Sequence, residues 1–168
     1  MAPVAQKGVK MKDVQKVLKK FEYGVYVVTM GKGTEGNAFT ASWVSQVSSE
    51  PPMVALSVHN KHQSSPLIKE NQAFVVNLID QNQEAVAKTY YGPAESGYNK
   101  LKSSSVADSP ATGTPLIPGA IGYIDCLVVK TVDTGNHTLF IAKVKAASLD
   151  DNVSQLMTTS NSKLHYTG

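Results

Sequence analysis

Six runs rich in β-branched and aromatic residues constrain the fold of this chain more than any other feature. They occupy residues 25–30, 37–49, 53–58, 73–79, 120–132 and 137–147. Between the last two runs lies Asp133-Thr134-Gly135-Asn136, a sequence typical of a tight hairpin turn. Strands joined by short turns pair antiparallel. The sequence therefore predicts a mainly antiparallel β structure.

Helices are predicted in three short segments between the strands. Residues 11–21 carry an apolar stripe at helical spacing, made of Val14, Val17, Leu18 and Phe21. A second helix is expected to begin at the N-cap Ser65, with Pro66 in its first turn, and to end near Asn71. A third follows the capping box that begins at Asp80.

Regular alternation of strands and helices is missing, and so is a Gly-rich dinucleotide fingerprint, which argues against a doubly wound fold. A small Greek-key antiparallel β-barrel with helices over its ends fits the pattern best. The length of 168 residues suits one such domain, predicted over residues 11–168 after a disordered tail at 1–10. Residues 93–119 are expected to form a long loop anchored by Tyr98 and Leu101, and the C-terminal tail to add a short helix and a last extended piece.

Composition excludes several classes of protein. The formal charge of +3 is too small, and its basic residues too scattered, to favour nucleic acid as a partner. The single cysteine, Cys126, excludes an internal disulfide and a multi-cysteine metal site, which fits a reducing cytoplasm. Residues 1–12 hold no apolar signal region, and no apolar run approaches the roughly 18 residues that span a bilayer. We therefore expect a cytoplasmic protein without a membrane segment.

The segment 37–49 is unusual because it carries no charge and is rich in short hydroxyl side chains. Its five hydroxyls belong to Thr40, Ser42, Ser45, Ser48 and Ser49. We expect one extended strand here, ended by the Pro51-Pro52 pair. Small residues let another surface approach the backbone, and hydroxyls can donate to anionic oxygens. Composition alone favours a simpler interpretation, a sheet edge that turns its hydroxyls to water, and only the neighbouring segments shift the balance toward a binding site.

A second candidate site precedes the helix that begins at Ser65. Asn60, Lys61 and Ser64 lie in this loop, and free amides at a helix N-terminus together with a lysine suit an anion. A routine capped helix beside a surface lysine is the alternative. His59 and His62 lie in the same loop, but no cysteine or carboxylate spacing accompanies them, so no metal site is predicted.

Taken in order, these pieces resemble a known family. GVYVVT follows the first helix, and then come NAFTASWVSQVSSEPPMVALSV, NKHQSSPLI, FVVNLI, a helix ending in YYG, and GNHTLFIAKV. The set is similar to the flavin reductase-like family, whose fold is the FMN-binding split barrel, over residues 14–144. Two features depart from the family pattern: the Ser-rich segment after YYG and the early end at Gly168. Both concern the residues that would contact the substrate.

The resemblance implies a flavin site. Residues that would line the flavin ring are Phe39, Thr40, Ala41 and Ser42, with Trp43 packed either on the flavin or in the core. Those on the ribityl and phosphate side would be Ser48, Asn60, Lys61 and Ser64. His137 would take a catalytic place on the nicotinamide side. Judged only by its position after a hairpin turn, it would instead be a histidine that hydrogen-bonds the backbone of that hairpin.

The function implied by this resemblance is hydride transfer from NAD(P)H to a bound flavin, with FMN favoured over FAD, in a homodimer. The flavin performs that chemistry, so the lack of a catalytic carboxylate pair or nucleophile is consistent with it. Two alternatives remain open: a flavoredoxin-type FMN carrier that serves a protein electron-transfer partner, and a non-enzymatic binding barrel that has lost flavin.

Overall fold

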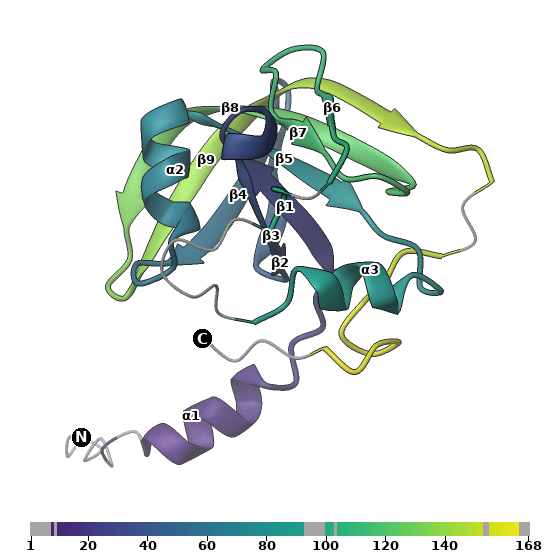
Figure 1. Ribbon diagram of the computed structural model, residues 1–168. Coiled ribbons are helices and arrows are strands. Elements are labelled where there is room, and N and C mark those ends of the chain that lie inside the picture. Colours follow the sequence, from purple (N-terminus) through teal and green to yellow (C-terminus); the bar gives the residue numbers. More distant parts are fainter. Residues whose placement is uncertain (1–7, 9, 93–99, 103, 153–154, 165–168) are drawn as a thin grey trace.

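The computed structural model describes residues 8, 10–92, 100–102, 104–152 and 155–164, and it is built around one seven-stranded sheet (Figure 1). The strands are β1 Tyr26–Met30, β2 Asn37–Ala41, β3 Val44–Ser49, β4 Pro52–His59, β5 Ala73–Leu78, β8 Gly122–Asp133 and β9 His137–Leu149. They pair antiparallel in the order β2-β1-β5-β8-β9-β4-β3. A separate two-stranded sheet joins β6 (Ala107–Asp108) to β7 (Pro115–Leu116). The expected mainly antiparallel β fold is confirmed.

The sheet curls into a barrel because its two edge strands follow one another in the chain. β2 and β3 lie at opposite edges of the sheet, yet only Ser42 and Trp43 separate them. Three peptide steps span at most about 11 Å, so the two edges must come close together. The barrel therefore has a seam between β2 and β3, which is where the chain passes from one edge to the other.

The prediction of a single strand over residues 37–49 is wrong at this seam. The Val44 amide donates to the Ser42 carbonyl over 3.0 Å, and the Trp43 carbonyl accepts from the Ser57 amide over 3.0 Å. Trp43 thus begins pairing with β4, while Ala41 still pairs with Tyr26 of β1. Closure of the barrel breaks the strand, although neither residue of the break is a glycine or a proline.

The core has two parts, one on each side of β1. Val28 and Met30 face the barrel interior, which is filled by Leu56, Ile68, Phe74 and Phe140. Val25 and Val27 face the opposite way, toward a cluster that contains Ile79, Ala87, Leu101 and Met157. β1 is therefore covered on both faces. Leu101 is fully buried, as expected for a loop anchor, whereas Tyr98 lies outside the described residues.

The three predicted helices are present, but the first is shorter than expected and the second begins earlier. α1 spans Met11–Leu18, has no buried residue and stands apart from the barrel (Figure 1). α2 spans Ser64–Asn71 and α3 spans Glu84–Thr89. None of the helices among the described residues is long and apolar enough to cross a membrane.

The expected N-caps are only partly right. Gln63 occupies the N-cap position of α2 and Ser65 lies inside the helix, so the prediction that Ser65 caps it is wrong. Before α3, the Gln83 side-chain oxygen accepts from the Asp80 amide over 2.9 Å, which is one arm of the predicted capping box.

The last two strands form the expected hairpin. Gly135 has a φ of 99°, which favours glycine, and its amide donates to the Asp133 carboxylate over 3.0 Å. After β9 the described tail makes isolated bridges, Leu156 with Asp80 and Thr158 with Gly24, and no helix. The expected disordered tail and last extended piece fall largely outside the described residues.

Candidate functional site

A cleft of about 430 Å³ opens at the seam of the barrel. β2 and the seam provide one wall, the end of β4 and the following loop provide another, and the C-terminal end of α3 forms the rim. The lining residues are Phe39, Thr40, Ala41, Ser42, Trp43, Ser57, Val58, His59, Lys61, His62, Tyr91 and Gly92. The wall is mostly small or apolar, and a single flexible cation, Lys61, lies among these residues.

Six of the ten sequence-predicted site residues line this cleft. They are Phe39, Thr40, Ala41, Ser42, Trp43 and Lys61. They converge because β2 and the loop after β4 meet at the seam, although about 20 residues separate them in the chain. The other four, Ser48, Asn60, Ser64 and His137, lie outside the lining.

Ser48 is distant from the cleft of its own chain. It pairs with Met53, four residues before Ser57, the first β4 residue in the lining. Four residues of strand extend about 13 Å. Ser48 therefore lies well along the barrel wall from this cleft.

Asn60 ties the loop after β4 to the β8–β9 hairpin. Its side-chain amide donates to the Gly135 carbonyl over 3.0 Å and its oxygen accepts from the Thr138 hydroxyl over 2.7 Å. Its backbone amide donates to the Asn136 carbonyl over 2.9 Å. Asn60 thus holds the loop in place.

Ser64 is fully buried at the start of α2, and its hydroxyl makes no hydrogen bond with any described residue. The amides expected to be free at this helix end are occupied. The Ser64 amide donates to Nδ1 of His62 over 3.2 Å, and the Ser65 amide donates to the His62 carbonyl over 3.1 Å. An anion at this loop would therefore be held mainly by side chains.

His137 lies behind the wall of the cleft. It is 4% exposed, its ring packs on Trp43 with centroids 4.8 Å apart, and it meets His59 edge-on at 4.9 Å. Its Nδ1 is 2.7 Å from the Asn136 side-chain oxygen. Burial, followed by the field of His59, lowers the pKa of His137 from its ordinary value, so the neutral ring is favoured. It contacts two lining residues without being one.

The sequence argument missed several lining residues. His59 and His62 were considered only as metal ligands, Ser57 and Val58 as ordinary strand residues, and Gly92 as a helix stop. Phe39 and His62 pack with ring centroids 4.7 Å apart, which places this histidine in the wall. Among the residues that the structure describes, no group of three His, Cys, Asp or Glu side chains could hold a metal ion.

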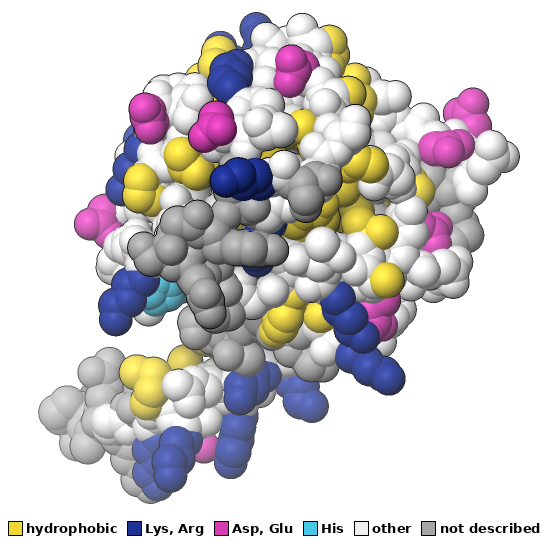
Figure 2. Space-filling view, in the orientation of Figure 1, with side chains coloured by type: hydrophobic (Ala, Val, Ile, Leu, Met, Phe, Trp, Pro, Cys, Tyr) yellow, Lys and Arg dark blue, Asp and Glu magenta, His cyan; other side chains and the backbone are white. Residues whose placement is uncertain are grey.

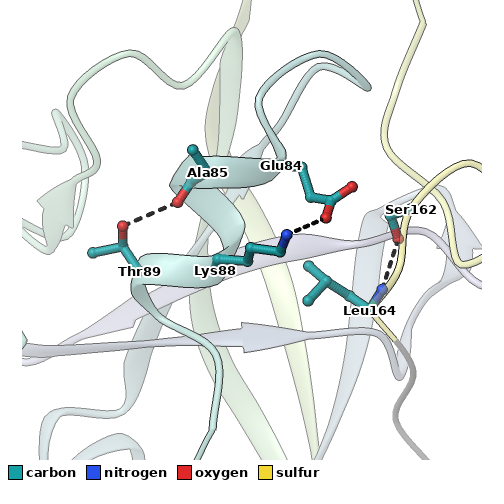
Figure 3. A network of polar contacts seen from close by, with 6 residues as sticks. All are labelled: Glu84, Ala85, Lys88, Thr89, Ser162 and Leu164. Carbon is teal, nitrogen blue, oxygen red and sulfur yellow. Dashed lines mark hydrogen bonds and ion pairs between the residues drawn. The ribbon is translucent and has the colours of Figure 1, made fainter.

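α3 is held against the seam and so fixes the rim. Thr40 donates through its hydroxyl to the Ala87 carbonyl over 2.5 Å and through its amide to the Tyr90 carbonyl over 3.0 Å. Within the helix, Lys88 pairs with Glu84 over 2.6 Å, and the Thr89 hydroxyl donates to the Ala85 carbonyl (Figure 3). The rim is therefore positioned by β2 itself.

Lys100 supports the same rim from outside. Its ammonium group donates to the Tyr90 carbonyl over 2.8 Å and to the Gly92 carbonyl over 3.1 Å. Burial lowers its pKa from the ordinary value. A lysine near the last helical carbonyls stabilises a helix end. No sequence pattern indicated this contact.

Comparison with known proteins agrees with the fold. The flavin reductase like domain matches residues 18–168. An uncharacterized protein of Pyrococcus abyssi is 33% identical over 72% of this chain and 70% of its own length. The NADH:FMN oxidoreductase of Rhodococcus erythropolis is 27% identical over 89% of this chain and 77% of its own length.

Among solved structures, the NADH:FAD oxidoreductase of Streptomyces globisporus C-1027 superposes with a TM-score of 0.80, at 26% identity, over 92% of both chains. The domain match covers most of the chain. A relative above 30% identity and a structure of similar fold agree with it. The chain belongs to the flavin reductase like domain family.

Proposed function

We propose that this chain is an oxidoreductase that binds FMN at the seam of its barrel and passes hydride to it from NAD(P)H. The observation that carries the proposal is the cleft between β2 and the loop after β4, with small residues on one side and Lys61 on the other. Two relatives, an NADH:FMN oxidoreductase and an NADH:FAD oxidoreductase, support the reaction class.

The small residues of the seam suit the flavin ring. Ala41 and Ser42 have short side chains, so a flat ring can approach the backbone of the chain as it leaves β2. Phe39 and Trp43 add apolar and aromatic surface on either side of them. When bound, the flavin accepts the hydride, and the residues of the cleft bind and orient it.

The basic side of the cleft suits a phosphate. Lys61 is exposed at this side, next to the turn that leads into α2. A lysine binds a phosphate as a mobile point charge. One lysine and one cleft of this size favour FMN as the ligand, whereas the relatives named above include one FMN and one FAD enzyme.

We further propose that the chain works as a homodimer. Among the described residues, α1 keeps an apolar stripe largely exposed: Val17 is 64% exposed, and Phe21, which follows the helix, is 57% exposed. Figure 2 shows hydrophobic side chains and lysines on different sides of this helix. An isolated helix of eight residues is marginal in water, so its stripe needs a partner surface.

The barrel offers such a surface to a second copy. Val47, Leu127, Val129 and Leu149 are large hydrophobic residues that are exposed on the strands. In a two-fold dimer, α1 of each subunit can cover the exposed barrel wall of the other subunit. One interface would then bury both sets of exposed apolar side chains.

The dimer proposal predicts a mass near twice the 18.0 kDa of the chain in solution. Replacing both Val17 and Phe21 by serine should shift the protein toward monomer, because the stripe loses its apolar contact. Light scattering over a range of micromolar concentrations measures this. Lys12→Ser, on the opposite side of α1, is the control and should leave the mass unchanged. A monomeric wild type with flavin present would contradict the proposal.

For the phosphate site, Lys61→Ala should weaken FMN binding by about ten- to a hundredfold, since a charge-assisted contact is worth roughly 1.5–3 kcal/mol. Riboflavin, which lacks the phosphate, should lose little affinity. Titrations of both ligands by flavin fluorescence measure the difference. Equal losses for FMN and riboflavin would show that Lys61 acts through the fold rather than on the phosphate.

Anaerobic mixing with NADH or NADPH tests the reaction itself, with the visible absorption of oxidised flavin as the signal. The wild type should bleach its flavin rapidly. His137→Ala should bleach about ten- to a hundredfold more slowly, a barrier increase of roughly 1.4–2.7 kcal/mol, because the nicotinamide side loses its support behind Trp43. Dithionite should reduce both proteins at the same rate.

Three results would contradict these assignments. If His137→Ala loses FMN or melts early while its rate per bound flavin is unchanged, His137 is structural. If the wild type binds FMN but bleaches slowly with both nucleotides, the flavoredoxin-type carrier is the better function. A wild type that ignores added FMN is a binding barrel without flavin.

A further inference from the structure

The loop between β4 and α2 consists of two turns in tandem, each of which begins at a histidine. The His62 amide donates to the His59 carbonyl over 2.9 Å, and the Ser65 amide donates to the His62 carbonyl over 3.1 Å. Each bond joins residues three apart, as in a β-turn. The first turn carries Lys61 and the second carries Ser64.

Each histidine also closes its own turn with its ring. Nδ1 of His59 accepts from the Lys61 amide over 3.0 Å, and Nδ1 of His62 accepts from the Ser64 amide over 3.2 Å. This bond to the residue two places on is the one that an aspartate or asparagine makes in an Asx turn. Three aspartate carboxylates make the same bond elsewhere in the chain. Each accepts from the backbone amide two residues on: Asp80 from Asn82 over 2.9 Å, Asp133 from Gly135 over 3.0 Å, and Asp150 from Asn152 over 2.9 Å.

The two histidine turns differ from the three aspartate turns in their surroundings. His59 and His62 line the cleft, whereas none of the three aspartates does. An aspartate closes a turn with a full negative charge, which would repel an anionic ligand beside it. A neutral histidine closes the turn without that charge, and with Nδ1 as acceptor its proton is on Nε2, where it is a donor.

The neutral ring is also the form that the site favours at His62. Burial, followed by the fields of Lys100 and His59, lowers the pKa of His62 from its ordinary value. A protonated His62 could not accept from the Ser64 amide, so the bond and the lowered pKa agree with each other.

We propose that His59 and His62 are positioning residues for the anionic group of the ligand: they close the two turns that hold Lys61 at the cleft and Ser64 in its buried place at the start of α2, and they do so without a negative charge. This proposal rests on the proposed function, in which that anionic group is the FMN phosphate. It goes beyond that function because it assigns the two histidines a role through the backbone of the loop.

Three variants at His62 distinguish the effect of the hydrogen-bond acceptor from the effect of a negative charge. His62→Asn keeps a neutral acceptor, His62→Asp keeps an acceptor but adds a negative charge, and His62→Leu removes the acceptor. All three lose the ring contact with Phe39, and His62→Asn and His62→Asp are also matched in size. Two measurements apply to each: hydrogen exchange of the Ser64 amide without ligand, and the affinities for FMN and riboflavin.

We expect the Ser64 amide to stay protected in His62→Asn and His62→Asp and to exchange faster in His62→Leu. Compared with His62→Asn, FMN affinity should fall about three- to tenfold in His62→Leu, through the loss of one turn bond. It should fall about tenfold or more in His62→Asp, through charge repulsion. Riboflavin should bind the three variants alike.

Equal protection of the Ser64 amide in His62→Asn and His62→Leu would overturn the turn-closing role. Equal FMN affinities in His62→Asn and His62→Asp would overturn the argument from charge. Failure of the proposed function looks different: the wild type would then bind neither FMN nor riboflavin. That result would overturn the ligand part of this proposal as well, while amide exchange would still decide the role in the turn.

Discussion

The two-residue link between β2 and β3 is the constraint on which the rest of the structure depends. Because Ser42 and Trp43 alone join the two edges of a seven-stranded sheet, the sheet must curl until those edges meet. A strand edge normally exposes unpaired backbone groups, and closure removes most of that exposure. Among the described strands no ladder joins β2 to β3, and the small residues Ala41 and Ser42 line the cleft at this seam. The cleft lies where the barrel closes imperfectly.

The same closure brings distant segments to the cleft. Thr40 of β2 donates hydrogen bonds to carbonyls at the end of α3, so β2 fixes the position of the rim. On the other side Asn60 fastens the loop after β4 to the β8–β9 hairpin, and this loop carries Lys61. The proposed flat aromatic ligand with one anionic end suits the composition of this cleft: small and apolar residues would contact the ring, and Lys61 would bind the anionic group. Hydride transfer to a flavin needs this orientation more than it needs an acid or a base.

Local patterns in the sequence predict much of this fold, because strands, the hairpin turn and the stripe of α1 follow from neighbouring residues. The break at Ser42 could not be predicted in this way, since no glycine or proline marks it and the pairing partner of the chain changes there from β1 to β4. The roles of Asn60, His59 and His62 were missed for a similar reason: their side chains act on backbone groups of the loop and hairpin, which sequence spacing does not reveal. The family resemblance predicts Phe39, Ala41, Ser42 and Lys61 at one flavin site; the structure brings these four residues to one cleft, and their binding of flavin stays a prediction.

Intrinsic fluorescence tests the central claim, that the seam holds the flavin, most directly. Trp43 is the only tryptophan of the chain and lines the cleft, so its emission reports on this site. A flavin at the seam would lie beside the indole and quench it. We predict that added FMN quenches the tryptophan emission and that the quenching saturates at one FMN per chain. Bound FMN that leaves the emission of Trp43 unchanged would contradict the account, because the flavin would then occupy another part of the molecule.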